Sequence, residues 1–297
     1  MRFAGEFAAF GTAVCWSAGS NFFAAAGRRL GSVVLNRLRI TVACVFLATA
    51  LLATRGAPWP LWASGEQVAL LAVSGWIGFV FGDTWYFRSL VILGPGRAAL
   101  LASFAPLFTA LIAWPALGER LGPLAWLGMA LTLGGVAWVM TGRHDAPAHP
   151  EGSVATGIAA GVLGALGQAG GYVLSKTALR TGIDPLSATV VRIVSAAAAI
   201  WLLAVLERDV RRTVEGLADR RGAAFMVAGA FCGPFLGVTL SLAALRYIEA
   251  GVAASITAFY PILTMLIAAR FHGERLTWRV LAGALVAVAG VVVLFLR

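Results

Sequence analysis

The sequence predicts an all-α integral membrane protein in which ten transmembrane helices form two inverted five-helix repeats. Composition, the spacing of apolar runs and an internal repeat predict this fold class. Of the 297 residues, 60% are hydrophobic and 12% are charged, whereas soluble domains are about 45–50% apolar and about 25% charged. Too few polar residues remain to cover the surface of a soluble protein, so we expect lipid to surround the chain.

Ten apolar runs follow one another along the chain, and most reach the roughly 20 residues that a helix needs to cross about 30 Å of hydrocarbon. The runs cover residues 5–26, 35–53, 67–87, 95–117, 123–141, 154–176, 185–206, 222–244, 251–271 and 277–296. The gaps are short, and neither of the longest, 142–153 and 207–221, can hold a soluble domain. We therefore expect a first five-helix repeat at 1–141, a linker at 142–153 and a second repeat at 154–297. A cleaved signal peptide is the alternative interpretation of the first run.

Basic residues outnumber acidic ones, and the formal net charge of +10 comes almost entirely from arginine, because Lys176 is the only lysine. The arginines lie mainly in the short gaps between apolar runs. There we expect them to anchor helix ends to anionic headgroups rather than to bind nucleic acid. The three cysteines lie within apolar runs without metal-binding or disulfide spacing, and we expect them to be small buried residues. They are Cys15, Cys44 and Cys232.

An internal repeat is visible because residues 75–140 align with residues 230–295 at a constant offset of 155, without a gap. Of these 66 positions 20 are identical, whereas composition alone would match roughly a tenth. The shared motifs are Gly78-x-x-x-Gly82-x-Thr84 with Gly233-x-x-x-Gly237-x-Thr239, Phe104-x-Pro106-x-x-Thr109 with Phe259-x-Pro261-x-x-Thr264, and Gly118-Glu119-Arg120-Leu121 with Gly273-Glu274-Arg275-Leu276. Upstream the correspondence is weaker, but Arg39 can be laid on Arg192, each followed by isoleucine.

The odd number of helices in each copy means that the second copy must enter the membrane from the opposite side. Inverted repeats of this kind are the architecture of many secondary transporters. Two similar halves in opposite orientations can exchange conformations, so that a central site opens first to one face of the membrane and then to the other. The repeat therefore favours a transporter that works by alternating access.

Two stretches of sequence carry a family resemblance. The end of the fourth run reads APLFTALIAWPALGERLG, and the same place in the second half reads FYPILTMLIAARFHGERLT. With the two five-helix halves, these stretches resemble the EamA-type family of the drug/metabolite transporter (DMT) superfamily over nearly the whole chain. The resemblance implies ten helices, a central cavity lined mainly by helices 1, 3, 4, 6, 8 and 9, and export of amino acids or other small metabolites. It does not specify the substrate.

Asp83 is the sharpest candidate for a functional residue, because it alone among the 13 acidic residues lies well inside an apolar run. A charge there is costly and usually faces a cavity or a partner. The counterpart of Asp83 in the second copy is Val238, so the carboxylate is not part of the shared scaffold. Three interpretations are open: a site for a substrate amine or a proton, a structural ion pair with an arginine, or a position near the headgroups. The candidate arginines are Arg39, Arg88 and Arg192.

Two arginines and two prolines lie at corresponding places in the two halves. Arg39 and Arg192 lie inside the second and seventh runs. Each could bind a substrate carboxylate through its forked guanidinium, but snorkelling toward the headgroups or structural pairing is favoured. Pro106 and Pro261 lie in the middles of the fourth and ninth runs, where each removes a backbone hydrogen bond. Their placement predicts paired helix bends around a central site, with simple tolerated kinks as the alternative.

Polar and aromatic residues inside the runs are candidates to line the substrate pathway. They are Trp16, Ser17, Asn21, Tyr86, Ser103, Gln168, Tyr172, Ser255 and Tyr260. Asn21 and Gln168 are the stronger ones because an amide in lipid needs partners, although interhelical hydrogen bonds explain them equally well.

Repeated glycines predict close contacts between helices. Gly78 with Gly82, and their counterparts in the second half, are spaced by four and predict helix packing. Glycines spaced by seven predict a packing face between helices or between subunits; they are Gly128 with Gly135 and Gly283 with Gly290. The two Gly-Glu-Arg motifs are expected to cap helix ends, with a gating salt bridge as the alternative.

Motifs of ATP-driven pumps and of common membrane enzymes are missing from the sequence. It contains no Gly-x-x-x-x-Gly-Lys-[Ser/Thr] and no His-Glu-x-x-His. The three histidines, His144, His149 and His272, lie in or beside loops. We therefore predict a protein that is not an enzyme and that needs no cofactor or metal. The predicted function is secondary transport, with export of small metabolites such as amino acids favoured; multidrug or lipophilic-cation efflux and a non-transporting scaffold are the alternatives.

The predicted partners are a small-molecule substrate and the lipid bilayer, without nucleic acid, in a multi-pass protein of a bacterial inner membrane. A homodimer and a monomer are both open. The orientation is contested, because with ten spans both termini lie on one side and the opposite side carries more basic residues. The positive-inside rule then places the termini outside, whereas the family resemblance implies termini inside.

Overall fold

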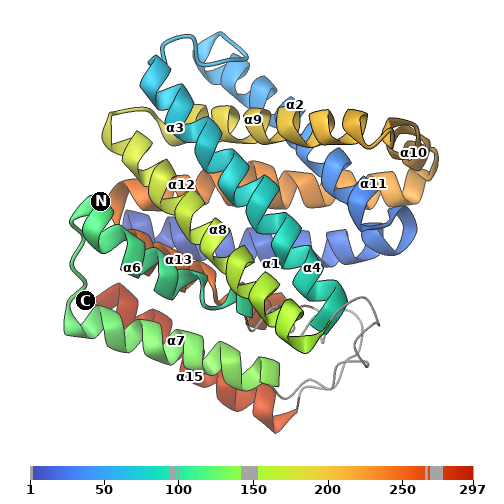
Figure 1. Ribbon diagram of the computed structural model, residues 1–297. Helices are drawn as coiled ribbons and strands as arrows, with labels where there is room; N and C mark the ends of the chain where they lie inside the picture. Colours follow the sequence, from blue (N-terminus) through green and yellow to red (C-terminus); the bar gives the residue numbers. More distant parts are fainter. Residues whose placement is uncertain are drawn as a thin grey trace.

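The computed structural model describes residues 3–93, 98, 101–141, 153–264, 267 and 277–296, and all regular structure in these ranges is helical (Figure 1). The first half contains α1 (Ala4–Leu30), α2 (Ser32–Arg55), α3 (Gly65–Gly75), η1 (Trp76–Gly82), α4 (Asp83–Leu93), α6 (Ala105–Leu117) and α7 (Pro123–Thr141). The second half contains α8 (Val154–Arg180), α9 (Pro185–Leu206), α10 (Val210–Glu215), η2 (Gly216–Ala218), α11 (Arg220–Ala230), η3 (Phe231–Gly237), α12 (Val238–Tyr247), α13 (Ala250–Thr257) and α15 (Trp278–Leu296). The predicted linker up to residue 152, the three histidines and the second Gly-Glu-Arg-Leu motif lie outside the described residues.

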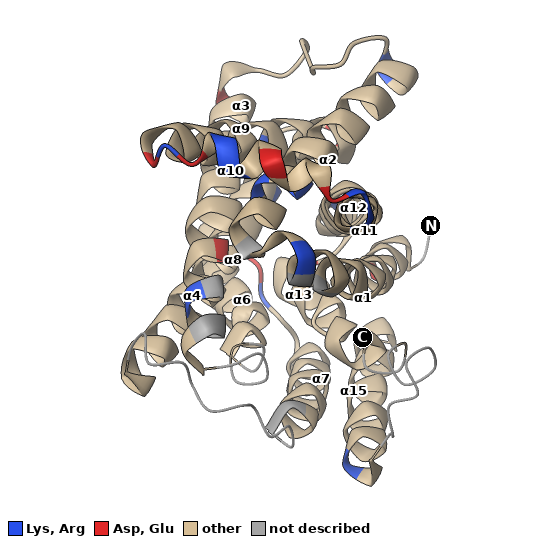
Figure 2. Cartoon of the chain, turned by 90° about the vertical axis from the view of Figure 1, so that its right-hand side faces the viewer, with Lys and Arg blue, Asp and Glu red and all other residues tan. Residues whose placement is uncertain are grey.

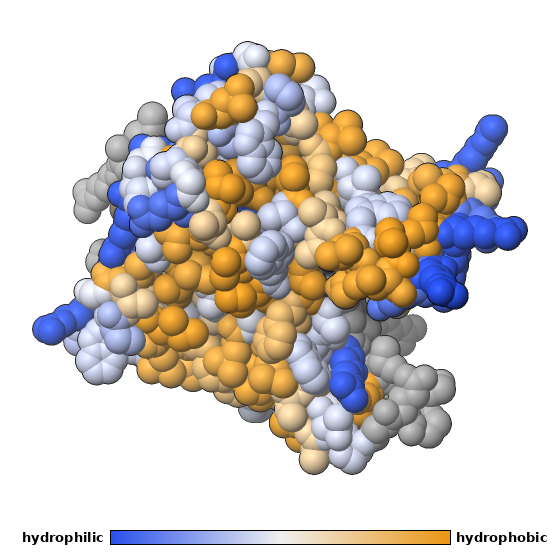
Figure 3. Space-filling model, turned by 45° about the horizontal axis from the view of Figure 1, so that its top comes forward, coloured by the Kyte–Doolittle hydropathy of each residue, from blue (hydrophilic) through white to orange (hydrophobic). Residues whose placement is uncertain are grey.

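Six helical segments within the described ranges are long and apolar enough to cross a membrane. They are Val33–Arg55, Gly65–Tyr86, Val154–Arg180, Pro185–Leu206, Arg220–Tyr247 and Trp278–Leu296. Shorter apolar helical segments overlap the fourth, fifth and ninth predicted runs: Ala105–Leu117, Pro123–Val139 and Ala250–Thr264, the last of which contains a turn at 258–259. Large apolar side chains such as Leu206 and Leu285 are exposed, and hydrophobic residues cover most of the face in Figure 3. Such a surface suits lipid rather than water.

Two π-helical segments interrupt long helices at positions that the sequence repeat makes equivalent. The segment η1 joins α3 to α4, and η3 joins α11 to α12. A π-helix uses i→i+5 hydrogen bonds and often occurs at functional sites. After each segment a threonine hydroxyl donates to a carbonyl four residues back, from Thr84 to Val80 at 2.5 Å and from Thr239 to Phe235 at 2.6 Å. The repeated Gly-x-x-x-Gly-x-Thr motif therefore folds in the same way in both halves.

The fourth and ninth predicted runs are each interrupted by a turn just before their prolines, and whether they form paired bends around a central site stays a prediction. Phe104 precedes α6 in a tight turn, in which its N–H donates to the carbonyl of Leu101 at 3.1 Å. Phe259 makes the equivalent turn, with a bond of 3.2 Å to the carbonyl three residues back. The next helix begins one residue before each proline. Pro106 and Pro261 therefore occupy a first helical turn, where a missing N–H costs no helical hydrogen bond.

Equivalent helices of the two halves have equivalent neighbours. Helix α8 packs against α3, η1 and α4, while its counterpart α1 packs against α11, η3 and α12. Helices α2 and α9 pair with each other, and so do α7 and α15, which lie side by side at one edge of the molecule (Figure 1). Each half therefore packs its first helix against the other half, and the two halves share one core.

Helices α7 and α15 approach so closely that their glycines have no room for a side chain. A Cβ atom on Gly135 would lie 2.5 Å from the carbonyl oxygen of Gly283, and one on Gly290 would lie 2.7 Å from that of Gly128. The pairing of 128 with 290 and of 135 with 283 makes the two helices antiparallel. The glycine face that the sequence predicted is therefore used in a contact between helices of the same chain.

Replacing Gly135 by alanine is expected to destabilise the protein by about 1–3 kcal/mol, because the new methyl group overpacks the contact between α7 and α15. Gly134 is the matched control, since a Cβ there would meet nothing within 4 Å. Thermal unfolding of the two variants in detergent micelles checks this expectation. Equal midpoints for Gly134→Ala and Gly135→Ala would contradict it.

Candidate functional site

Asp83 lies at the first position of α4, directly after η1, and both of its carboxylate oxygens accept hydrogen bonds. Oδ2 accepts from Nη2 of Arg39 at 2.8 Å, and Oδ1 accepts from Nε2 of Gln168 at 3.0 Å. The side chains of Arg39 and Asp83 are only 9% and 13% exposed. Of the three open interpretations, the geometry is that of a buried ion pair. A role for Asp83 toward a substrate or a proton stays a prediction.

The two partners of this carboxylate come from α2 and α8 and are themselves held in place. Arg39 donates through Nε to Oδ1 of Asn36 at 2.8 Å, and its Cζ lies 5.4 Å from the ring centre of Phe23 on α1. Gln168 also donates to the backbone carbonyl of Gly78 in η1 at 3.2 Å. Arg39 is therefore structurally paired, and its guanidinium turns into the protein rather than toward the headgroups.

Small residues allow α8 to approach η1 closely enough for Gln168 to reach the cluster. A Cβ on Gly82 would lie 3.3 Å from the backbone nitrogen of Gln168, and one on Gly167 would lie 2.7 Å from the Cα atom of Gly82. Gly78 has another neighbour, because a Cβ there would lie 2.7 Å from Nη2 of Arg192. One glycine of the pair therefore packs helices together, and the other leaves space for a charged side chain.

Arg192 on α9 is the second buried arginine of this cluster, and it is 2% exposed. Its Cζ lies 4.8 Å from the ring centre of Phe79 and 6.0 Å from that of Tyr172. Within the described part of the chain its guanidinium is in no hydrogen bond or ion pair that the structure shows, and its Nε is buried without a partner. It is close enough to Asp83 for the two charges to interact. Arg39 thus has a bonded carboxylate, whereas Arg192 does not.

Several other predicted residues lie near this cluster or in the equivalent place of the other half. Tyr86 on α4 is close enough to Asp83 and to Tyr260 for electrostatic interaction. Trp16 on α1 contacts η3, where its Nε1 would lie 3.1 Å from a Cβ added to Gly237. Gly237 is the counterpart of Gly82, so Trp16 stands where Gln168 stands in the other half.

The remaining predicted residues make local contacts. Asn21 donates to the carbonyl of Ser17 at 3.0 Å, and the hydroxyl of Ser255 donates to the carbonyl of Gly251 at 2.7 Å. The hydroxyl of Ser17 is buried and has no hydrogen-bond partner among the residues that the structure describes. Ser103 lies in the turn before α6. That these residues line a pathway stays a prediction.

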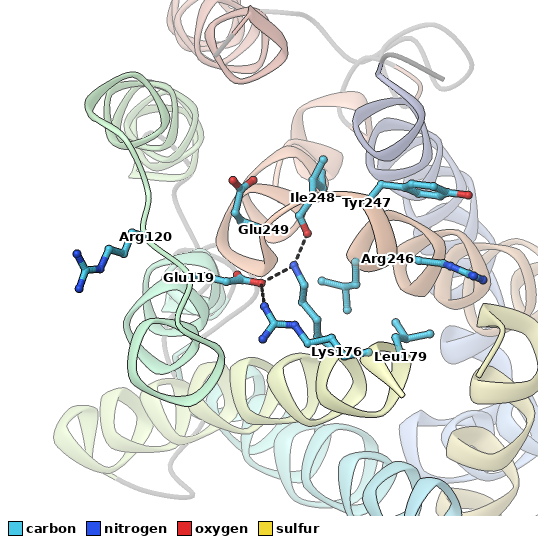
Figure 4. Close-up of a pocket in the computed structure, with 10 residues that line it drawn as sticks. Glu119, Arg120, Lys176, Leu179, Arg246, Tyr247, Ile248 and Glu249 are labelled. Atoms are coloured by element: carbon cyan, nitrogen blue, oxygen red, sulfur yellow. Dashed lines mark hydrogen bonds and ion pairs between the residues drawn. The ribbon is translucent and has the colours of Figure 1, made fainter. Parts of the chain in front are cut away.

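A second charged site, built on the first Gly-Glu-Arg motif, joins the ends of α6, α8 and α12 (Figure 4). Oε1 of Glu119 lies 2.5 Å from Nζ of Lys176 and 3.4 Å from Nη2 of Arg180. Its Oε2 accepts the N–H of Ala250, the first residue of α13, at 2.8 Å. Lys176 also donates to the carbonyl of Ile248. These side chains border a pocket of about 410 Å³.

Glu119 therefore caps the start of α13 and also forms a salt bridge, and a gating role for this bridge stays a prediction. Gly118 allows this, because it ends α6 at a φ of 68°, a conformation that suits glycine. The single lysine at the end of an apolar run was a visible signal for this site. The sequence did not show that Lys176 pairs with Glu119, because the two residues lie in different halves of the chain.

The opposite end of the molecule, around α10, carries ion pairs that also join the two halves (Figure 2). Arg37 on α2 contacts Glu207 and Asp209, each at 2.7 Å. Arg29 contacts Asp219 at 2.7 Å, and its hydrogen bond, together with one from a backbone N–H, lowers the pKa of Asp219. The sequence assigned such arginines to headgroup anchoring. The structure adds that acidic residues of the second half engage these two arginines, and their anchoring to headgroups stays a prediction.

Comparison with known proteins identifies the family. The sequence model of the EamA-like transporter family matches the chain twice, over residues 3–141 and 155–296. The chain belongs to the EamA-like transporter family. This confirms the predicted family, and with the apolar helices it makes the chain a multi-pass membrane protein.

Two further likenesses extend this result. The uncharacterized protein PA1977 of Pseudomonas aeruginosa is 30% identical over 235 residues, which cover 76% of this chain and 75% of the relative. One solved structure, described only as a crystal structure of a protein, matches with a TM-score of 0.74 over 99% of this chain and 96% of its own, at 19% identity. The second likeness shows the fold alone. Neither description names a substrate, which must therefore be argued from the site.

Replacing Asp83 by asparagine is expected to destabilise the EamA-family fold by about 3 kcal/mol, because Arg39 then stays buried without its counter-charge. The double variant Asp83→Asn/Arg39→Met removes that charge and is expected to recover part of the loss. Unfolding in detergent measures both variants. Glu215→Gln is the control, since its ion pair with Arg211 is exposed and contributes little. An Asp83→Asn protein as stable as the native chain would contradict this expectation.

Proposed function

We propose that this EamA-family protein is a secondary transporter that exports small metabolites, with amino acids as the first class to test. The observation that carries the proposal is the cluster of Asp83, Arg39 and Arg192, buried inside a bundle of apolar helices. Ionisable groups at such depth are costly, and in membrane proteins they usually mark the pathway of a substrate or an ion. Family membership supports transport without naming the substrate.

The proposed architecture is that of ten spans in two inverted five-helix repeats. The antiparallel contact of α7 with α15 supports it, because these helices are equivalent in the sequence repeat and run in opposite directions. The breaks before Pro106 and Pro261 support it as well. Inverted-repeat transporters commonly use interrupted helices near their binding sites, at equivalent places in both halves.

The charged networks at the two ends suit alternating access, because each joins one half to the other. Glu119 of the first half contacts Lys176 of the second at one end. Arg37 of the first half contacts Glu207 and Asp209 of the second at the other end. In the proposed cycle, one network opens while the other stays closed.

Uptake into proteoliposomes tests the function. A panel of labelled amino acids and lipophilic cations is offered to the native chain and to Asp83→Asn, with and without a pH gradient. Asp83 is proposed to bind a substrate amine or a proton. In either role, its carboxylate must first separate from Arg39. We expect saturable uptake of amino acids that is largely lost in the variant.

The other outcomes of this experiment separate the alternatives. Equal uptake by both forms would keep the transporter and remove Asp83 from the pathway. Uptake of cations alone would favour multidrug efflux. A folded preparation that takes up nothing from the panel would contradict the proposal and favour a scaffold.

Replacing Glu119 by glutamine is expected to loosen the network at its end, because Lys176 and the start of α13 both lose a carboxylate. The readout is maleimide labelling of Ser255→Cys on α13, in a chain without its three native cysteines, and labelling should become several-fold faster. Arg120→Gln is the matched control, because this neighbouring side chain is exposed and points away from the network in Figure 4. Equal labelling rates in the two variants would argue against a gate.

A further inference from the structure

The central cluster contains more positive than negative charge. Both oxygens of Asp83 already accept hydrogen bonds from Arg39 and Gln168. Arg192 is almost fully buried, with 2% of its surface exposed. Within the described ranges it nevertheless has no carboxylate within ion-pair distance. A buried charge without a bonded counter-charge is strongly unfavourable in a low-dielectric interior. The site is therefore suited to an anion that is not part of the chain.

The internal repeat indicates which group is missing. Arg39 and Arg192 occupy equivalent positions, but the counterpart of Asp83 is Val238. The first half thus contains both an arginine and its carboxylate, whereas the second half contains the arginine alone. A carboxylate carried by a ligand would supply the missing charge and the missing hydrogen-bond acceptor.

The guanidinium of Arg192 is confined by neighbours that are small or aromatic. A Cβ on Gly78 would lie 2.7 Å from its Nη2, and one on Gly171 would lie 2.9 Å from the same atom. The rings of Phe79 and Tyr172 flank the group at 4.8 and 6.0 Å. The side chain is thus positioned by packing, and its Nε–H has no hydrogen-bond partner among the described residues. A guanidinium in this state suits a carboxylate, which it can bind through two parallel hydrogen bonds.

We infer that Arg192 receives the carboxylate of the transported molecule when the central site opens. This inference rests on the proposed transport function and adds a substrate class to it. Carboxylate-bearing metabolites, with or without an amino group, bind in preference to their amides and to lipophilic cations. A cation would add to the excess positive charge of the cluster, whereas a carboxylate neutralises it.

Stability without any ligand provides a first test, which does not depend on transport. Arg192→Met puts a side chain of similar length in place of a charge that has no bonded counter-charge, and it is expected to raise the unfolding midpoint in detergent. Arg39→Met is the matched control and is expected to lower the midpoint, because it leaves Asp83 buried and unpaired. A fall for Arg192→Met as large as that for Arg39→Met would show that the guanidinium is already compensated, and it would overturn the inference.

Substrate selectivity in proteoliposomes provides the second test. The probes are the protein amino acids and the corresponding amino acid amides, compared one pair at a time. For each transported pair, the acid is expected to be taken up about tenfold better than the amide. Arg192→Met should lose this preference, while Arg192→Lys keeps the charge but not the fork and should retain part of it.

Two glycine variants, one as the test and one as its control, probe the same site while Arg192 itself stays unchanged. Gly78→Ala places its Cβ against Nη2 and should weaken the preference for acids. Gly170→Ala, whose Cβ would make an ordinary contact of 3.4 Å with Ile77, should leave it unchanged. Equal uptake of acids and amides, or a preference that persists in Arg192→Met, would overturn the inference while transport stands. If neither acids nor amides are taken up, amino acid transport itself fails, and the stability comparison alone decides the role of Arg192.

Discussion

A carboxylate that is buried in an apolar helix bundle must be paired, because a bare charge in a low-dielectric interior is strongly unfavourable. Asp83 meets this constraint through Arg39 on α2 and Gln168 on α8, so that one side chain ties three helices together. These contacts need backbones that approach closely, which the glycines of η1 and α8 permit. Charge pairing and small-residue packing therefore depend on each other in this fold.

The two halves share a scaffold but not its chemistry. Both contain a π-helical segment followed by a threonine bond, a helix broken before a proline, and glycines in the α7–α15 contact. The polar side chains differ: Asp83 corresponds to Val238, and Gln168 stands where Trp16 stands in the other half. The buried carboxylate is thus found in only one half of an otherwise repeated core. In the proposed transport cycle, this asymmetry lets similar halves move against each other around a site that is not itself symmetric.

Much of this architecture could be predicted from the sequence, because it depends on composition and on short-range pattern. The apolar runs indicate membrane helices whatever their arrangement. The repeated motifs mark the places where both halves leave regular α-helix. Asp83 could be singled out because charge is rare inside an apolar run. Arg39 and Arg192 could be named as candidates by the same reasoning.

Tertiary structure decided which of these groups meet. The sequence offered Arg39, Arg88 and Arg192 equally as partners for Asp83, and the crossing of α2 selects the first, whereas Arg88 is exposed and stacks on a neighbouring tryptophan. The salt bridge of Glu119 likewise forms because the ends of α6 and α8 come together. By itself, the sequence determined that this is a membrane protein with an internal repeat, because apolar length and self-similarity can be read from the order of the residues without knowing how the chain folds. The ion pairs required the folded chain, because each joins residues that only helix packing brings within bonding distance.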